Sequence, residues 1–368
     1  MKKQFTKVFF ALGTLIISTL GNTQVNPQNM REGENIEYCK QHVKLNELMQ
    51  NPAYYEQYLK DQQTLKATEL ALKQSQTTRS TYYIPVVFHV LHVGGNENIS
   101  DEQIHDAVAI LNRDFRRLNA DANTVHADFN ASNPDRVAEP ADIEVEFRLA
   151  TIAPDGTCFS GITRTFSALT NESDGYDQVD AIKAGNDVYR GEWKGDQYLN
   201  IFVIRNADGA AGYTNYPSNW GGGNSMENGI WVLHNYVGSI GTSSGGTSRT
   251  LTHEVGHWLN LPHTWGSTNE PGLMSNCSTD DGVSDTPNTI GSQSCKLSEN
   301  SCGPRANVEN YMDYSYCSKM FTIGQGDRMR AALASTVGGR KNIVSASNLA
   351  AVGADGNLAL CNVNFEAS

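Results

Sequence analysis

Hydrophobic and polar positions along the chain follow two spacings, which predict strands in some segments and helices in others. The run TYYIPVVFHVLHV, which starts at Thr81, is β-branched and aromatic and is typical of a strand. The runs IEVEFRLA, YLNIFVI and GIWVLHNYV have the same character. After the first run, apolar residues recur every three or four positions from Ile104 to Phe115. Ser100 stands three residues before Gln103, so we predict a long helix that a capping box opens. A helix between strands indicates an α+β fold with a mixed sheet backed by helices.

Two more helices are predicted in the second half of the chain. The segment SRTLTHEVGHWLNL contains no proline, and we expect it to be helical. Gln325 to Ala334 should form a final helix. Residues 264–320 lack periodicity and are rich in Gly, Asn, Ser, Asp and Cys, so we expect loops there. The stretch from Asn206 to Asn228 is predicted to be a loop, either the rim of a substrate cleft or a plain connection.

Residues 25–79 differ in composition from the chain that follows them. They are polar and helix-prone, and they end in a Gln-, Thr- and Ser-rich linker, with a domain boundary near Arg79. We therefore expect an amphipathic helical segment before the main domain. Its apolar residues at three- and four-residue spacings are Leu45, Leu48, Met49, Tyr54, Tyr58 and Leu59.

Residues 1–24 have the pattern of a secretory signal peptide. Lys2, Lys3 and Lys7 precede an apolar run from Val8 to about Leu20, and small and polar residues follow. A membrane anchor is the alternative, but the run is short for a bilayer span. We therefore expect a secreted, extracellular protein that has no membrane attachment after the signal is removed.

The charge balance excludes one class of partner. The 368 residues include 40 acidic and 28 basic ones, which gives a formal net charge of -12. Binding to phosphate backbones draws on clustered Lys and Arg. We therefore expect no nucleic-acid partner, and we expect a monomer.

The strongest chemical signal is a histidine motif in the predicted middle helix. His253 and His257 are four residues apart, so both imidazoles project from one helix face. Glu254 lies on the adjacent edge, where it can take a proton from water at a metal ion. His263 completes H-E-x-x-H-x-x-N-x-x-H, and a chain that turns away at Asn260 brings His263 back as a third ligand. The motif predicts a catalytic zinc site with one open position, although a buried structural histidine pair is the alternative.

The residues that follow this helix fit the metzincin class of zinc peptidases. At Asn260 that class usually has Gly, and Asn is the other residue that best tolerates a left-handed backbone. Pro262 prevents the helix from continuing. Met312, in the sequence YMDY, matches the methionine turn beneath the zinc, although a methionine is more often core filler.

The chain has seven cysteines, four of which lie between residues 277 and 317. In a secreted protein such a cluster indicates disulfides. A zinc ribbon is the alternative, but the sequence contains no C-x-x-C pair.

Taken together, HEVGHWLNLPHTWG, C-x-x-D-D-G-V-S-D-T-P, ENYMDYS and MFTIGQ resemble the pappalysin family of metzincins. The similarity extends to YIPVVFHVLH, LNIFVI and IWVLHNYVGSIG, and spans roughly residues 80–335. It implies a catalytic domain at 80–345, with an upper sheet-and-helix half at about 80–263 and a lower irregular half at about 264–345 bordering a cleft. The resemblance implies that His253, His257 and His263 are the zinc ligands and that Glu254 is the general base. It also implies that Met312 forms the methionine turn and that Tyr314 stabilises the charge on the scissile carbonyl.

The resemblance also implies two disulfides and a calcium site in the lower half. Four cysteines allow three pairings, and the family order pairs Cys277 with Cys302 and Cys295 with Cys317. The family calcium site corresponds to oxygen atoms of a short acidic turn, which suit calcium. A solvated acidic turn is the alternative. The matching residues are Asp281, Thr286 and the carbonyl of Ser284, with Asp285 nearby.

Specificity is where the chain departs from the family. Some members place an Asp just before the last of these cysteines, where it selects Arg on the primed side of the scissile bond. Here Tyr316 precedes Cys317. We therefore expect an apolar or broader specificity.

The remaining cysteines suggest a latent zymogen and a disulfide that joins the C-terminal tail to the catalytic domain. Cys39 lies where some related zymogens place a cysteine on the open zinc position, so we predict that residues 25–79 are a propeptide removed near Arg79. A cysteine with no special role is the alternative. By elimination, Cys158 and Cys361 can pair with each other. Residues 346–368 form a tail that reads as the possible start of a further module.

These observations predict a secreted zinc-dependent endopeptidase that acts on proteins or peptides. A zincin whose third ligand is a downstream Glu is the alternative within the same class. A non-catalytic secreted adhesin or binding protein that retains a structural zinc is the alternative from another class.

Overall fold

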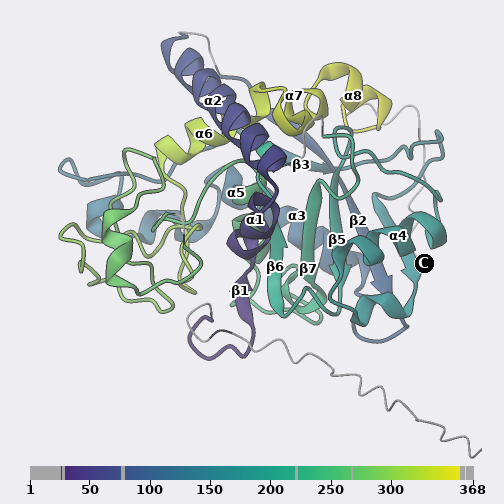
Figure 1. Cartoon of the computed structure of the whole chain (residues 1–368), viewed down its shortest axis with the longest axis horizontal. Helices are drawn as coiled ribbons and strands as arrows, with labels where there is room; N and C mark the ends of the chain where they lie inside the picture. The colour runs from purple at the N-terminus through teal and green to yellow at the C-terminus, as the bar shows by residue number, and fades with distance from the viewer. Residues whose placement is uncertain are drawn as a thin grey trace, which may run out of the picture.

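The computed structural model describes most of the chain that follows the predicted signal peptide. The described residues are Asn26, 30–75, 79–219, 223–266, 268–356 and Cys361. The predicted signal peptide at 1–24 and most of the predicted tail beyond 356 lie outside the described residues. A sheet with helices on both faces occupies one side of the molecule, and an irregular half lies beside it (Figure 1).

A mixed sheet forms the upper half. Within the described residues it has seven strands, in the order β1-β6-β7-β5-β2-β3, with β4 paired to the second half of β2. All neighbours are parallel except β6 and β7, so the predicted mixed sheet is confirmed. The strands are β1 (Glu37–Cys39), β2 (Tyr82–His92), β3 (Val145–Leu149), β4 (Ile162–Phe166), β5 (Leu199–Ile204), β6 (Ala210–Thr214) and β7 (Gly229–Leu233).

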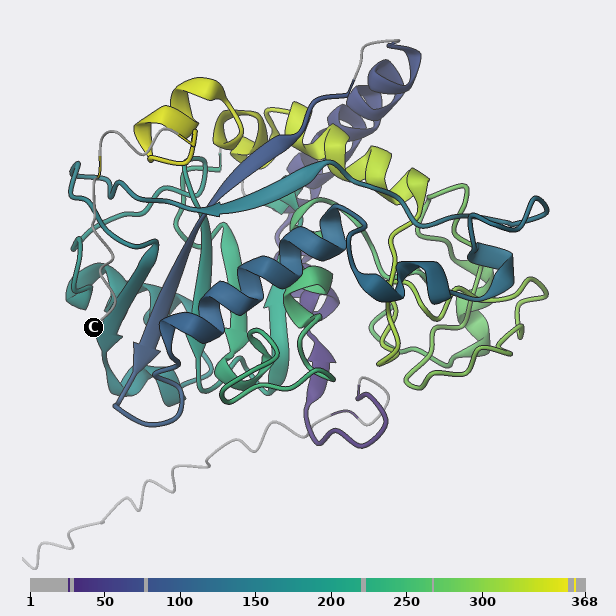
Figure 2. The same ribbon diagram turned by 180° about the vertical axis from the view of Figure 1, so that it is seen from behind.

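Helices cover both faces of the central strands. Every residue of β5 and β7 is buried, as expected for parallel strands packed on two sides. Helix α3 lies across one face (Figure 2), and α4 lies on the other (Figure 1). The helices are α1 (Gln41–Met49), α2 (Pro52–Gln74), α3 (Asp101–Phe115), α4 (Gly175–Gly185), α5 (Thr250–Trp258), α6 (Ile323–Ala334), α7 (Arg340–Ile343) and α8 (Ala346–Ala351).

The predicted long helix is present, but only half of its predicted capping box is. The Ser100 side chain accepts a hydrogen bond from the Gln103 N–H over 3.2 Å. The Gln103 side chain does not return to the Ser100 N–H, because it is buried and its oxygen accepts from the Thr242 N–H over 3.0 Å. Its amide nitrogen donates to the carbonyls of His234 and Val237. Gln103 therefore joins α3 to the loop after β7. A complete capping box opens α6 instead, between Thr322 and Gln325.

Six of these strands and helices were not predicted from the sequence: β1, β4, β6, α4, α7 and α8. Strand β6 lies inside the stretch from Asn206 to Asn228, so the prediction of a continuous loop there was wrong. Its sequence AAGYT is small and glycine-containing, and it carries little strand signal. The short strands β1 and β4, and helix α4, were also missed. Asp174 caps α4 by accepting hydrogen bonds from the Tyr176 and Asp177 N–H groups.

The lower half is irregular and stapled, as predicted. Disulfides join Cys277 to Cys302, Cys295 to Cys317, and Cys158 to Cys361. The two pairings that the family resemblance implied are present, and the two cysteines left over by elimination, Cys158 and Cys361, also pair.

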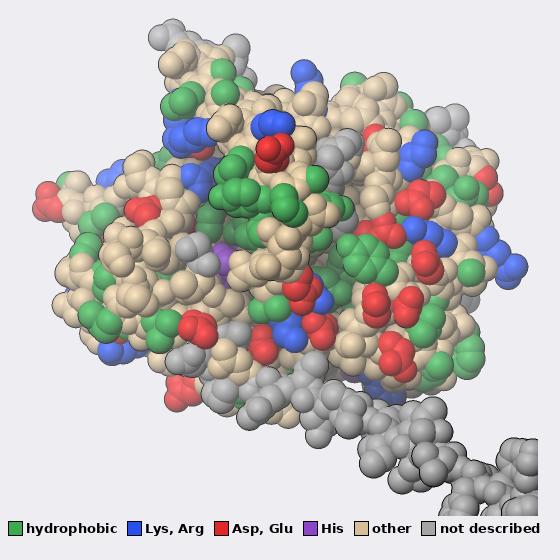
Figure 3. Space-filling view, viewed as in Figure 1, with side chains coloured by type: hydrophobic (Ala, Val, Ile, Leu, Met, Phe, Trp, Pro, Cys, Tyr) green, Lys and Arg blue, Asp and Glu red, His purple; other side chains and the backbone are tan. Residues whose placement is uncertain are grey.

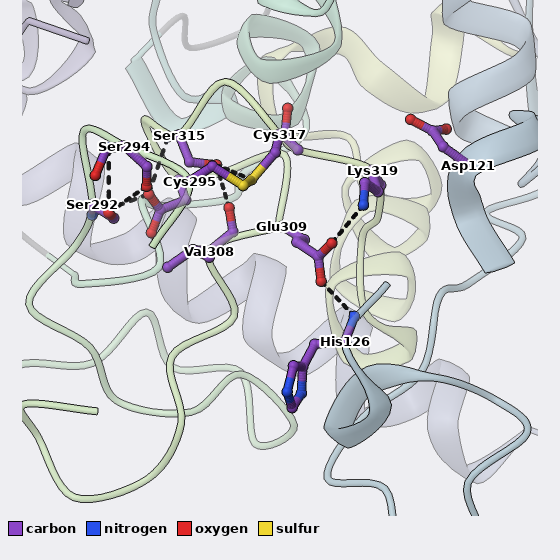
Figure 4. Close-up of a disulfide and its surroundings, with 12 residues drawn as sticks. Asp121, His126, Ser292, Ser294, Cys295, Val308, Glu309, Ser315, Cys317 and Lys319 are labelled. Carbon is purple, nitrogen blue, oxygen red and sulfur yellow. Dashed lines mark hydrogen bonds and ion pairs between the residues drawn. A yellow bond between two sulfur atoms is a disulfide. The ribbon is translucent and has the colours of Figure 1, made fainter. Parts of the chain in front are cut away.

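A buried carboxylate lies near the Cys295–Cys317 disulfide (Figure 4). Glu309 accepts a hydrogen bond from the His126 N–H over 2.6 Å and pairs with the Lys319 ammonium over 2.7 Å. These contacts tie the lower half to the segment that follows α3.

The N-terminal segment is helical, as predicted, but its apolar pattern only partly faces the protein. Tyr54 and Leu59 are more than 40% exposed, whereas Leu45 and Leu65 are buried. Leu65 packs with Ala332 of α6 in a small cluster. None of the helices in the described part is both long and apolar enough to cross a membrane.

Candidate metal and catalytic site

Three histidines predicted as ligands converge on one point. The Nε2 atom of His257 lies 3.1 Å from that of His253 and 3.2 Å from that of His263. All three side chains are buried. The Cys39 Sγ atom completes a group of four donor atoms that lie within 4.8 Å of one another. The structure thus brings together the three predicted zinc ligands and the cysteine that was considered as a latency ligand.

The hydrogen bonds behind the rings orient them for a metal ion. The Nδ1 atom of His253 bonds to the Tyr311 carbonyl over 2.7 Å, and that of His257 bonds to the Leu261 carbonyl over 2.6 Å. A carbonyl only accepts, so Nδ1 carries the proton and each Nε2 presents a lone pair. Burial lowers the histidine pKa values, to about 3 for His253. Neutral lone pairs facing each other at this distance call for a cation between them, so the residues fit zinc.

The chain leaves α5 at Asn260 as predicted. Asn260 has a φ of 75°, in the left-handed region. Its N–H and that of Leu261 return to the carbonyls of His257 and Gly256, which closes the helix. The turn carries His263 back beneath the other two rings.

Gly256 and Met312 fit together beside the histidine cluster. A Cβ atom added at Gly256 would lie 2.3 Å from the Met312 Sδ atom. Met312 is fully buried. The methionine therefore supports the helix between its two histidines, at the one position where the helix has no side chain.

Glu254 lies beside the histidines in a dry environment. Burial raises the pKa of its carboxyl to about 8, and the neighbouring Cys39 thiol lowers it to a smaller extent. Gly212 of strand β6 faces it closely, because a Cβ there would be 3.2 Å from the Glu254 Cγ atom. A carboxylate with a raised pKa next to a metal site is suited to proton transfer.

Tyr314 reaches the site together with a residue that the sequence did not indicate. Its ring centroid lies 4.8 Å from that of His263. The Tyr314 hydroxyl is 2.8 Å from the Asn269 Oδ1 atom and 3.3 Å from the Cys39 carbonyl oxygen. The Asn269 amide also donates to the Cys39 carbonyl, over 3.2 Å. Asn269 belongs to no motif, so only the fold reveals it.

The N-terminal segment fills the space in front of the site. Strand β1 pairs parallel with β6, with Cys39 opposite Gly212. The Tyr38 ring packs edge-on against His253 and Tyr314, both at 5.0 Å between centroids. His42 stacks on His263 at 5.0 Å.

Two further contacts hold this segment against the catalytic side. Arg31 donates to the Tyr314 and Ser315 carbonyls and lies over the Tyr38 ring. The Gln62 amide of α2 donates to Asn260 Oδ1 over 2.9 Å. The segment therefore contacts the site from β1, α1 and α2.

The residues predicted to bind calcium lie in one turn but have different surroundings. Asp281 and Thr286 are buried, and each has a side-chain oxygen, Oδ2 and Oγ1, with no hydrogen-bond partner among the described residues. Burial raises the Asp281 pKa well above its usual range. Asp285 is engaged elsewhere, because it accepts hydrogen bonds from the Thr322 hydroxyl and the Gly324 N–H. Both Asp285 oxygens are therefore bonded to the start of α6, whereas the Asp281 and Thr286 side-chain oxygens are not.

A family model and two curated proteins are similar to this chain, and both of the proteins are extracellular metalloproteases. A family model described as "Pregnancy-associated plasma protein-A" matches residues 183–334. An extracellular metalloprotease of Colletotrichum graminicola is 27% identical over 264 residues, which cover 68% of this chain and 75% of that protein. An extracellular metalloprotease 1 of Coccidioides posadasii is 37% identical over 139 residues, 36% of this chain and 48% of that protein.

Two solved structures are similar to this chain over nearly their whole length. A promirolysin mutant of Tannerella forsythia superposes with a TM-score of 0.68 and 30% identity, over 84% of this chain and 97% of that chain. Mature mirolysin of the same organism, in complex with a cleaved peptide, superposes with a TM-score of 0.63 and 33% identity, over 75% of this chain and 99% of that chain.

Proposed function

The chain belongs to the pappalysin family of metzincin zinc metallopeptidases, and from that membership we propose how its residues divide the work of peptide-bond hydrolysis. The protein is a secreted zinc-dependent endopeptidase with peptide substrates. We propose that His253, His257 and His263 hold the zinc and that Glu254 moves the proton. The observation that carries this proposal is the convergence of the three Nε2 atoms beside a buried carboxyl.

The proposed mechanism relies on one metal property and on residues of this chain. When bound, zinc supplies a Lewis acid that polarises the scissile carbonyl and makes water more acidic. Glu254 takes a proton from the attacking water and later gives it to the leaving amine. Its dry surroundings support both steps, because a raised pKa lets one group act as base and then as acid.

Tyr314 and Asn269 are proposed to stabilise the charge that develops on the carbonyl oxygen. The Cys39 carbonyl, which both side chains contact, stands where a substrate carbonyl would be. Tyr314 is the proposed catalytic donor. Asn269 is proposed to hold the Tyr314 hydroxyl in place and to add an N–H donor of its own. Because the hydroxyl has one proton, Tyr314 turns it from the Asn269 oxygen to the substrate carbonyl as charge develops there.

The test is cleavage of casein by the activated protein and by its Glu254→Gln variant, with and without a zinc chelator. We expect wild-type cleavage that the chelator abolishes, and a variant that keeps one zinc per chain but loses turnover. His263→Ala should lose zinc. A Glu254→Gln protein that still cleaves would contradict the assigned base. A non-catalytic zinc protein would cleave in neither form, and a zincin with a downstream Glu ligand would keep its zinc in His263→Ala.

We propose that residues 25–79 keep the enzyme latent, with Cys39 as the fourth zinc ligand. The position of the Cys39 Sγ atom among the three imidazoles supports this. The alignment lengths support it as well, because promirolysin covers 84% of the chain and mature mirolysin only 75%. Release near Arg79 would then free the open position. Mass spectrometry of the activated protein locates the cleavage.

We also propose a structural calcium ion at Asp281, Thr286 and the Ser284 carbonyl. The buried oxygens of Asp281 and Thr286 without partners support it, because an orphaned buried carboxylate oxygen calls for a cation. Asp285 instead accepts hydrogen bonds from Thr322 and Gly324 at the start of α6. Calcium should raise the melting temperature of the wild type and have no effect on Asp281→Asn; equal effects on both proteins would contradict the site.

A further inference from the structure

Asp208, which follows the N-terminal segment in the main domain, forms ion pairs with two lysines of that segment. The Lys44 ammonium lies 2.9 Å from the Asp208 carboxylate, and the Lys40 ammonium lies 3.4 Å from it. Lys40 also donates to the Asp208 carbonyl. These lysines are the ion-pair partners of Asp208 within the described part of the chain. The catalytic domain itself supplies the anion, and the segment supplies both cations.

An aromatic wall stands beside this carboxylate. The rings of Tyr213 and Trp231 are stacked, with centroids 5.0 Å apart and planes 10° apart. The Lys44 ammonium lies 5.2 Å from the centre of the Tyr213 ring, within the range of a cation–π contact. A carboxylate next to a ring face is a combination that binds a Lys or Arg side chain.

The two features line one cavity. It has a volume of about 480 Å³, and its wall includes Asp208, Tyr213, Trp231 and Asp174, closed on one side by Lys44 and Glu47 of α1. The Nε1 atom of Trp231, a residue only 3% exposed, has no hydrogen-bond partner among the described residues. This group is an N–H donor, so a carbonyl oxygen of a bound peptide, and not the cationic side chain itself, is what can satisfy it.

The surroundings favour positive charge. Burial raises the Tyr213 pKa well above its usual range, and the charges of Asp208 and Asp174 raise it further. Acidic side chains gather over β6, β7 and α4 on this face of the molecule (Figure 3). The cavity's wall contains one basic residue among the described ones, Lys44, and that residue belongs to the segment proposed to leave.

We propose that Asp208, Tyr213 and Trp231 form a cation subsite, which receives a Lys or Arg side chain of the peptide substrate once the N-terminal segment has left. This inference rests on the proposed peptidase activity and on release of that segment. Strand β6 follows Asp208 directly and carries Tyr213, and β1 already pairs with β6. A substrate strand on the same edge would bring its side chains within reach of the subsite.

The test uses the full-length, zinc-loaded protein after proteolytic activation, with a neutral parent peptide that it cleaves. In a series of peptides, one residue at a time is replaced by lysine or by norleucine. The readout is the kcat/KM ratio of each replaced peptide to the parent, measured within each protein. The test variant is Asp208→Asn. Asp208 has a φ of 56°, in the left-handed region, which asparagine also tolerates. The control is Asp180→Asn on α4, because the Asp180 side chain is 74% exposed.

Lysine, but not norleucine, should raise the ratio about threefold to tenfold at one or two positions, as a partly buried ion pair with a cation–π contact would. The increase should persist in Asp180→Asn and fall below about twofold in Asp208→Asn, since the ion pair is then lost. A series with no lysine preference, or a preference that survives in Asp208→Asn, would overturn the inference. Cleavage of the parent peptide by the wild type decides the proposed function separately.

Discussion

The hydroxyl of Tyr314 and the side-chain oxygen of Asn269 lie 2.8 Å apart at the edge of the histidine site. The Asn269 oxygen accepts that hydrogen bond, and its amide turns to the Cys39 carbonyl. A single asparagine therefore both holds the tyrosine and adds a donor of its own. In the proposed mechanism the Tyr314 proton turns from the Asn269 oxygen to the substrate carbonyl, so that both side chains then donate to the same carbonyl oxygen.

Tyr314→Phe should lower kcat about a hundredfold with little change in KM, because loss of one oxyanion donor removes an interaction that strengthens in the transition state. Asn269→Ala should lower kcat less, since Tyr314 keeps its hydroxyl. Both variants should retain one zinc per chain, measured by atomic emission. If Tyr314→Phe raised KM and left kcat unchanged, the tyrosine would bind the substrate and not the transition state.

Gly256→Ala should destabilise the zinc helix. The added Cβ would lie 2.3 Å from the Met312 Sδ atom in a closed core, and such overpacking costs about 1–3 kcal/mol. Thermal unfolding with bound zinc measures the loss. The matched control is Gly245→Ala, where a Cβ meets nothing within 4 Å.

The same contact can be isolated by a double-mutant cycle. Met312→Ala removes the side chain that the new methyl group would strike. The cost of Gly256→Ala should therefore be smaller in the Met312→Ala background than in the wild type. Equal costs in the two backgrounds would show that the methionine does not pack beneath this glycine.

Cys39→Ala should weaken the latency of the full-length protein. Its thiol lies within 4.8 Å of the three imidazole donors, and a zinc-bound thiolate would be lost with it. Cleavage of a quenched peptide by the uncleaved protein should therefore rise above that of the wild type. The rise should be partial, because Arg31 and β1 still hold the segment. Asn46→Ala, an exposed change on α1, should remain latent.

The sequence predicted those parts of the site that depend on local spacing. Two histidines one helical turn apart, and a turn at Asn260, need only the backbone geometry of a helix end. Asn269 and the pairing of Asp208 with Lys44 depend on contacts between distant segments, so no spacing reveals them. Strand β6 was missed for a related reason, because its AAGYT sequence becomes a strand only when β7 and β1 pair with it.

Glu299 should make the lower half sensitive to acid. Burial alone would raise its pKa, but hydrogen bonds from the Lys296 ammonium and from the Ser301 hydroxyl and N–H outweigh burial and lower the pKa to about 2. Its unfolded value is 4.5. A lowered folded pKa means that the carboxylate's stabilisation is fully present above pH 4.5 and is lost as the pH falls through 2.

The comparison that measures this is chemical unfolding of the wild type and Glu299→Gln between pH 2 and 8. At pH 7 the variant should be less stable by about 1 kcal/mol, a modest value because solvent screens the exposed Lys296 partner. The difference should shrink below pH 4.5 and approach zero near pH 2. Any acid loss of zinc affects both proteins and cancels. Glu56→Gln, whose side chain is 76% exposed, should match the wild type throughout, and a Glu299→Gln difference that stayed constant with pH would contradict the assignment.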